Sequence, residues 1–183
     1  MEVPTLDRKW EAAALADYNF SGVADGATKE FQRQAEVCIQ GTMQIALACD
    51  ARASTHTGFF LAGATALAVS AASYARAPAA NLPLAYGGAA AAALLLLAAA
   101  SCSIAARSVY FHVAGYQPKF LAVTASNELF MLRCVAEDLQ RRIDFNVAAL
   151  ARQARWFGNG QIAALASLPF GAAVYFASRF AGV

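Results

Sequence analysis

The hydrophobicity pattern is dominated by three uncharged apolar stretches, at roughly residues 57–75, 77–106 and 156–178. Each can cross a hydrocarbon layer about 30 Å thick, which takes about 20 helical residues. Because backbone polar groups in lipid must be satisfied within the segment, such segments are helical. The pattern therefore predicts an all-α integral membrane protein with three transmembrane helices, at about 57–75, 84–106 and 159–178.

A soluble alanine-rich helical bundle is the alternative, because alanine promotes membrane insertion only weakly. Composition argues against it: the chain is 59% hydrophobic and 14% charged, whereas soluble domains average about 45–50% and 25%. Small residues such as Gly63, Gly88 and Gly171 predict close contacts between helices in lipid. Pro169 predicts a kink in the third segment, where neighbouring helices tolerate it.

The charged parts of the chain carry two amphipathic helices. In the first, Thr28 is a plausible N-cap, and the helix runs without a proline from Lys29 into the first transmembrane segment. Its apolar positions recur at steps of three and four residues: Phe31, Ala35, Cys38, Thr42, Ile45 and Cys49. Residues 1–27 are predicted to be weakly ordered, and residues 28–183 to form one membrane domain.

The second amphipathic helix is predicted at 126–157, after Pro118. Its apolar stripe has a heptad-like spacing: Leu129, Leu132, Ala136, Leu139, Ile143, Val147, Leu150, Ala154 and Phe157. The opposite face is charged, and it includes the i,i+4 pairs Glu137–Arg141 and Asp138–Arg142. We expect the two amphipathic helices to pack on each other or on further copies of the chain, which predicts a homo-oligomer.

The distribution of basic residues predicts the orientation in the membrane. Twelve of the 14 Lys and Arg residues lie before the first segment or between the second and third. Because cytoplasmic loops carry the basic residues, we expect a cytoplasmic N-terminus, a cytoplasmic middle helix and an outward C-terminus.

Motifs for enzymatic chemistry are missing from the sequence. His56 and His112 have no metal-spaced partner, the four cysteines form no C-x-x-C pair, and no phosphate-binding glycine loop is present. We therefore expect no enzyme, no metal and no cofactor. The net charge of +2 gives no reason to expect nucleic acid as a partner.

A polar collar precedes the first transmembrane segment and consists of Asp50, Arg52, Ser54 and His56. One interpretation is a gate, or a contact with the cytosolic helices. The other is ordinary charge at the membrane edge, with Arg52 extending to the interface.

The order of these elements resembles a known family. An acidic-x-basic-Ala step, Asp50 to Ala53, leads into the first transmembrane segment, and a basic run, Arg152 to Trp156, precedes the last. Over roughly residues 28–180 this layout resembles the Pycsar effectors, small transmembrane proteins of bacterial nucleotide-signalled antiphage defence. The motifs are short, and the family pattern maps onto Asp50, Arg52, Arg152 and Arg155.

The resemblance implies a function. A companion pyrimidine nucleotide cyclase would make cCMP or cUMP on infection. The effector, in the bacterial inner membrane, would bind this regulatory ligand, rearrange or assemble, and damage the membrane in abortive infection.

A nucleotide site is predicted here only from the chemical groups that a cyclic nucleotide needs. A cyclic monophosphate needs cationic or backbone donors, and its base needs an aromatic face or an amide edge. Arg133, Arg141, Arg142 and Phe145 are the predicted ligand-binding residues, with Arg141 and Phe145 on one helix face.

Two other functions compete with this one. The chain could be a non-enzymatic membrane scaffold or oligomeric interaction protein, whose cytosolic helices dock a partner. A small transporter or channel subunit is disfavoured, because no transmembrane segment carries an ionisable residue at mid-depth.

Overall fold

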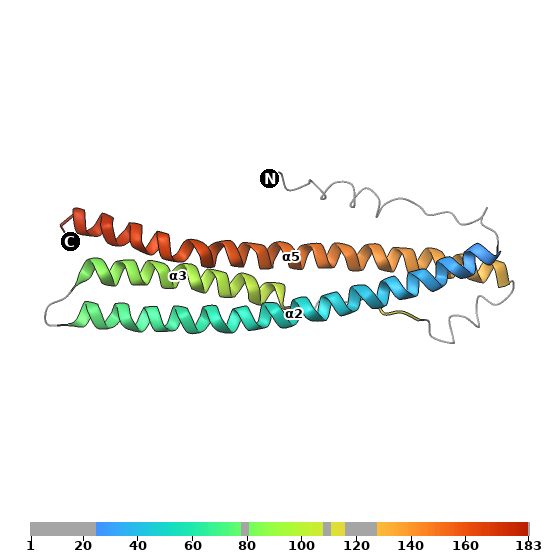
Figure 1. Ribbon diagram of the computed structural model, residues 1–183, viewed down its shortest axis with the longest axis horizontal. Helices are drawn as coiled ribbons and strands as arrows, with labels where there is room; N and C mark the ends of the chain where they lie inside the picture. Colours follow the sequence, from blue (N-terminus) through green and yellow to red (C-terminus); the bar gives the residue numbers. More distant parts are fainter. Residues whose placement is uncertain (1–24, 78–80, 108–110, 116–127, 183) are drawn as a thin grey trace. The chain divides into compact units, whose positions relative to one another are not determined.

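The computed structural model describes residues 25–77, 81–107, 111–115 and 128–182. These residues form three long helices and no strand (Figure 1): α2 (Asp25–Arg76), α3 (Leu82–Ala105) and α5 (Glu128–Phe180). The all-α prediction is therefore confirmed over the described ranges. Most of the predicted weakly ordered segment, residues 1–24, lies outside them, and residues 25–27 are helical.

All three helices are long and apolar enough to cross a membrane. In their apolar stretches only 11%, 33% and 17% of the residues of α2, α3 and α5 are buried inside the chain. Most of the apolar side chains therefore face outward and form a surface that lipid would solvate better than water. The bounds of α3 agree within two residues with the predicted segment at 84–106.

Both long helices run through their predicted polar and apolar parts without a break. α2 joins the first amphipathic helix to the first transmembrane segment, as predicted. It begins at Asp25, however, so Thr28 is a buried residue inside the helix and the predicted N-cap is wrong. α5 joins the predicted 126–157 helix to the third segment, and Pro169 lies inside it.

Contacts divide the described residues into two compact units. Unit 1 comprises residues 25–47, 111–115 and 128–151. Unit 2 comprises residues 48–77, 81–107 and 152–182. Helices α2 and α5 contribute to both units, whereas α3 belongs to unit 2. The three apolar segments are thus in unit 2, and most of the charged residues are in unit 1.

In unit 1 the two amphipathic helices pack on each other, as predicted. Ile39 of α2 and Val135 and Leu139 of α5 form a buried core, each no more than 2% exposed. Lys29 and Glu128 form an ion pair of 2.9 Å at the surface. An exposed pair of this kind contributes little, so apolar burial is what holds the two helices together.

The predicted apolar stripe of α2 is correct only in part, because Thr42 is buried and Ala35 packs against the core. Phe31 and Ile45 are 45% and 56% exposed, whereas Ile39 and Ala46 are buried. Both sets have three- and four-residue spacing, so periodicity does not separate them.

Unit 2 is held together by small residues where its helices meet. A Cβ built on Gly171 of α5 would lie 2.8 Å from the Gly87 carbonyl oxygen of α3 and 2.9 Å from the Ala91 Cβ. A Cβ on Gly160 would lie 2.7 Å from the Cys102 Sγ. These distances are below van der Waals contact, so both positions require glycine, as expected for helices packed in lipid.

Candidate functional site

The polar collar contributes one side chain to a contact between two helices. Asp50 of α2 accepts a hydrogen bond of 3.1 Å, at Oδ1, from the Gln153 Nε2 of α5. Gln153 is only 4% exposed. Both residues precede the apolar segments of their helices, so this buried polar contact joins α2 to α5 where the first and third segments begin. We call Asp50 and Gln153 the acid–amide pair.

The acid–amide pair is incompletely hydrogen-bonded. The Gln153 Oε1 is buried and has no hydrogen-bond partner, which is costly in an apolar setting. Burial raises the pKa of the Asp50 carboxyl, and the hydrogen bond from Gln153 opposes this effect in part. A protonated carboxyl has an O–H donor, which is the group that the orphaned amide oxygen lacks.

Protonation of Asp50 should therefore stabilise unit 2. Because the folded-state pKa is raised above the ordinary value of 3.8, the stabilisation is fully present below that value. It is lost as pH rises through the raised pKa. We expect unit 2 to unfold at higher temperature near pH 4, close to the ordinary pKa of the carboxyl, than at pH 7, measured by circular dichroism in detergent.

Replacing Asp50 with asparagine should remove this pH dependence, because asparagine is neutral and supplies a donor at every pH. We expect Asp50→Asn to stabilise the protein at pH 7 by about 1 kcal/mol. A variant that keeps the wild-type pH dependence would show that Asp50 is not its source.

His56 takes a different role from the rest of the collar. Its ring packs edge-on against Phe60 of α2 and Phe157 of α5, with centroid distances of 5.8 and 5.1 Å. Its Nδ1 donates to the Arg52 carbonyl oxygen at 2.8 Å. His56 is therefore an aromatic packing residue, while the Arg52 and Ser54 side chains are exposed.

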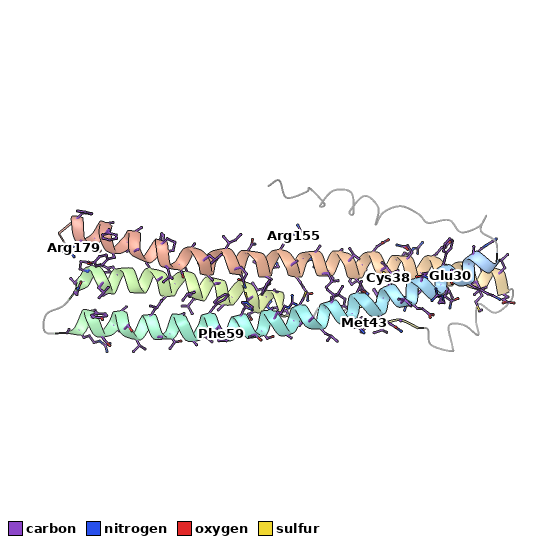
Figure 2. The ribbon with its side chains drawn as sticks, in the orientation of Figure 1. Glu30, Cys38, Met43, Phe59, Arg155 and Arg179 are labelled. Atoms are coloured by element: carbon purple, nitrogen blue, oxygen red, sulfur yellow. The ribbon has the colours of Figure 1, made fainter. Side chains whose placement is uncertain are left out.

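Of the four family-pattern positions, Asp50 contacts the basic run of α5, but through Gln153, a residue that was not predicted. Asp50 contacts Gln153, which lies inside the basic run, rather than Arg152 or Arg155, both of which are exposed (Figure 2 labels Arg155). Ala154 was predicted to lie on the contact face, but it is exposed. A usable signal was present: Leu139, Asn146 and Gln153 recur every seven residues, and all three are buried.

The predicted nucleotide-binding residues lie in unit 1, on the first half of α5. Arg142 forms an ion pair with Asp138 at 2.7 Å, as predicted. The same guanidinium donates to the carbonyl oxygens of Val113 and Gly115, at 3.2 Å each. Arg142 is therefore occupied in holding residues 111–115 against α5.

Phe145 is also engaged with this segment. Its ring packs against His112 at a centroid distance of 4.9 Å, and it remains 47% exposed. Beside it, the fully buried Asn146 exchanges two hydrogen bonds of 2.9 Å with the backbone of His112. The amide of Asn146 thus pairs with both backbone polar groups of residue 112, a contact that the sequence did not predict.

The remaining two predicted residues differ in accessibility. Arg141 is exposed and forms no ion pair with a described residue, so the predicted Glu137–Arg141 pair is absent. Arg133 is half-buried. Of the four predicted residues, Arg141 has the charge most accessible to an anion.

Unit 1 also contains a groove between its two long helices, with a volume of about 480 Å³. Its lining is mainly apolar with two amides: Phe31, Gln34, Ala35, Cys38, Ala136, Gln140 and Ile143. None of the four predicted ligand-binding residues lines it. The groove and the arginines are therefore separate features of the same unit.

Neither a metal site nor a similar protein assigns a function to the described residues. The described ranges hold no group of three or more His, Cys, Asp and Glu side chains placed to bind a metal ion. In comparisons with known proteins, no protein-family model, no curated protein and no solved structure matches this chain.

Proposed function

We propose that this chain is a membrane effector that a cyclic pyrimidine nucleotide, cCMP or cUMP, activates to impair the integrity of the bacterial inner membrane. It would serve in an antiphage abortive-infection system, with a pyrimidine nucleotide cyclase as its functional partner. In this proposal unit 1 and the N-terminus are cytoplasmic, and the C-terminus faces outward.

The observation that carries the proposal is the continuity of α2 and α5. Each helix belongs to polar unit 1 in one half and to apolar unit 2 in the other. A ligand that changes how the helices pack in unit 1 therefore acts on two of the three transmembrane segments through unbroken backbone. Such a ligand shifts the protein only through a difference in affinity between two states.

The acid–amide pair supports a change of state at the beginning of the transmembrane segments. It links α2 and α5 through a single hydrogen bond and leaves one buried amide oxygen without a partner. A buried polar contact that is half satisfied stabilises one arrangement only weakly. Small rearrangements of α2 and α5 near the acid–amide pair should therefore cost little free energy.

The experiment for this function measures propidium iodide uptake in bacteria that express the full chain with an active or an inactivated pyrimidine nucleotide cyclase. We expect dye uptake only with the active cyclase. Intact membranes in the presence of verified cCMP and cUMP would overturn the proposal.

A matched pair of variants tests whether Arg141 contributes to ligand binding. Arg141→Gln and Gln44→Glu each lower the net charge by one at an exposed position of unit 1. We expect Arg141→Gln to raise the nucleotide concentration needed for dye uptake about tenfold, as the loss of one charge-assisted hydrogen bond would. We expect Gln44→Glu to leave that concentration unchanged. Equal responses of the two variants would remove Arg141 from the site.

A scaffold function is the second candidate, and exposed apolar side chains of unit 1 favour it. Val37, Ile45 and Leu47 on α2 are 56%, 56% and 66% exposed. If these side chains form one continuous surface, it would suit a protein contact, and in this proposal the contact is with another copy of the chain. Constitutive oligomers without dye uptake under any nucleotide would favour the scaffold over the effector.

A further inference from the structure

A second groove lies within unit 2, beside the first residues of the apolar segment of α2 and the middle of α3. It has a volume of about 510 Å³ and collects side chains from all three helices. They are His56, Phe59 and Phe60 of α2, Leu95 of α3, and Gln161, Ala164, Leu165, Ser167 and Leu168 of α5. Its rim is strongly exposed: Phe59 (Figure 2), Leu165 and Leu168 are 72%, 78% and 73% exposed.

One polar atom in this apolar groove lacks a partner. The Gln161 Nε2 is buried and has no hydrogen-bond acceptor. In contrast, the other polar side chain of α5 in the lining, Ser167, donates to the Ala164 carbonyl oxygen at 2.7 Å. An amide donor without an acceptor in an apolar medium is costly. The atom is buried in this conformation, so an occupant that brings an acceptor would draw the amide of Gln161 into the groove that this residue lines.

An unpaired cation lies one helical turn from the groove. Arg52 precedes His56 by four residues on the same face of α2, about 6 Å along the axis. Its side chain is exposed and forms no ion pair with a described residue. An arginine here can bind a phosphate with two parallel hydrogen bonds.

We infer that the unit 2 groove binds one glycerophospholipid. The lipid phosphate binds Arg52, an ester carbonyl accepts a hydrogen bond from the Gln161 Nε2, and an acyl chain lies over Phe59, Leu165 and Leu168. In a glycerophospholipid a phosphate, an ester carbonyl and an acyl chain follow one another in this order from the interface inward.

A transmembrane helix of a second copy fits the groove less well. The contacts between helices within this chain use small residues, such as Gly87 against Gly171. The groove is instead bordered by bulky leucine and phenylalanine side chains, which hold a helix backbone at a distance. A flexible acyl chain fills such a surface more closely.

The test is a lipid titration of the purified full-length protein in detergent, followed by native mass spectrometry. Diester phosphatidylglycerol is compared with its diether analogue, which lacks the carbonyl acceptors. We expect the diester to bind about fivefold more tightly, the factor that a hydrogen bond of about 1 kcal/mol gives. Equal affinity of the two lipids for the wild-type protein would overturn the proposal.

Variants test the contacts of the ester, the phosphate and the acyl chain one at a time. Gln161→Leu should abolish the preference for the diester, and Arg52→Gln should weaken both lipids while keeping the preference. Leu165→Trp should weaken both by filling the groove. Ile162→Trp is its matched control, because Ile162 is 68% exposed on the same helix but does not line the groove.

The same spectra distinguish a lipid from a second copy. If Gln161→Leu dissociates an oligomer and leaves lipid binding unchanged, the groove is a contact between copies and the inference is wrong. The inference does not depend on nucleotide activation, because the titration contains no nucleotide.

Discussion

Replacing Gly171 with alanine is expected to destabilise the protein, and the same replacement at Gly158 is expected to stabilise it. A Cβ at 171 would lie 2.8 Å from the Gly87 carbonyl oxygen, so α3 and α5 must move apart. At 158 nothing lies within 4 Å of the new atom. Both residues are inside α5, so the change in helix propensity is the same and only the contact differs.

The two replacements are expected to change the free energy of unfolding in opposite directions. Overpacking at 171 should cost about 1–3 kcal/mol, partly offset by the gain of about 0.5–1 kcal/mol that alanine brings to a helix interior. Gly171→Val should cost more than Gly171→Ala. Thermal unfolding in detergent, followed by circular dichroism, measures both. Stabilisation by Gly171→Ala would show that α3 and α5 are not in close contact.

Replacing Asn146 with alanine is expected to release residues 111–115 from α5. The side chain donates to the His112 carbonyl oxygen and accepts from the His112 amide, and both bonds are 2.9 Å. Asn146 is fully buried, so its loss leaves two backbone groups unsatisfied. We expect a cost of about 2 kcal/mol or more.

Hydrogen exchange gives a local readout of this change. The His112 amide should lose protection in Asn146→Ala, while amides in the middle of α3 keep theirs. Gln44→Ala is the control, because Gln44 is exposed on α2 and alanine favours the helix at either position. Unchanged protection of the His112 amide would contradict the pairing with Asn146.

The helices were predictable because hydrophobic length and helical period are local properties of the chain. The three apolar segments and the continuation of α2 from the polar part into the first segment followed from the absence of charges and of proline. Apolar burial between the two amphipathic helices also followed, because neither had another partner. These features depend on composition over many residues rather than on any one contact.

The contact faces were less predictable because several stripes share the same spacing. Large apolar residues such as Phe31 and Ile45 suggested one face of α2, but the structure buries Ile39 and Ala46. In α5 the same preference for apolar residues selected Ala154, where the structure buries Gln153. A buried amide is recognised only with its partner, and Asp50 lies 103 residues away.

The candidate nucleotide site shows the same limit. Arg142 was predicted both to pair with Asp138 and to bind a nucleotide. The ion pair is present, but the guanidinium also donates to the carbonyl oxygens of residues 113 and 115, which the sequence did not indicate. Sequence identifies which arginines are near each other on a helix. It does not show which of them are already hydrogen-bonded to distant backbone, and this is why Arg141 now carries the prediction.

Dye release from liposomes containing the purified full-length protein tests the central claim most directly, because no other cellular component is present. Vesicles loaded with a self-quenched dye would receive cCMP, cUMP or cAMP on the side that unit 1 faces. We predict release with cCMP or cUMP and none with cAMP. Sealed vesicles with all three nucleotides, with insertion of the protein verified, would contradict a nucleotide-activated membrane effector.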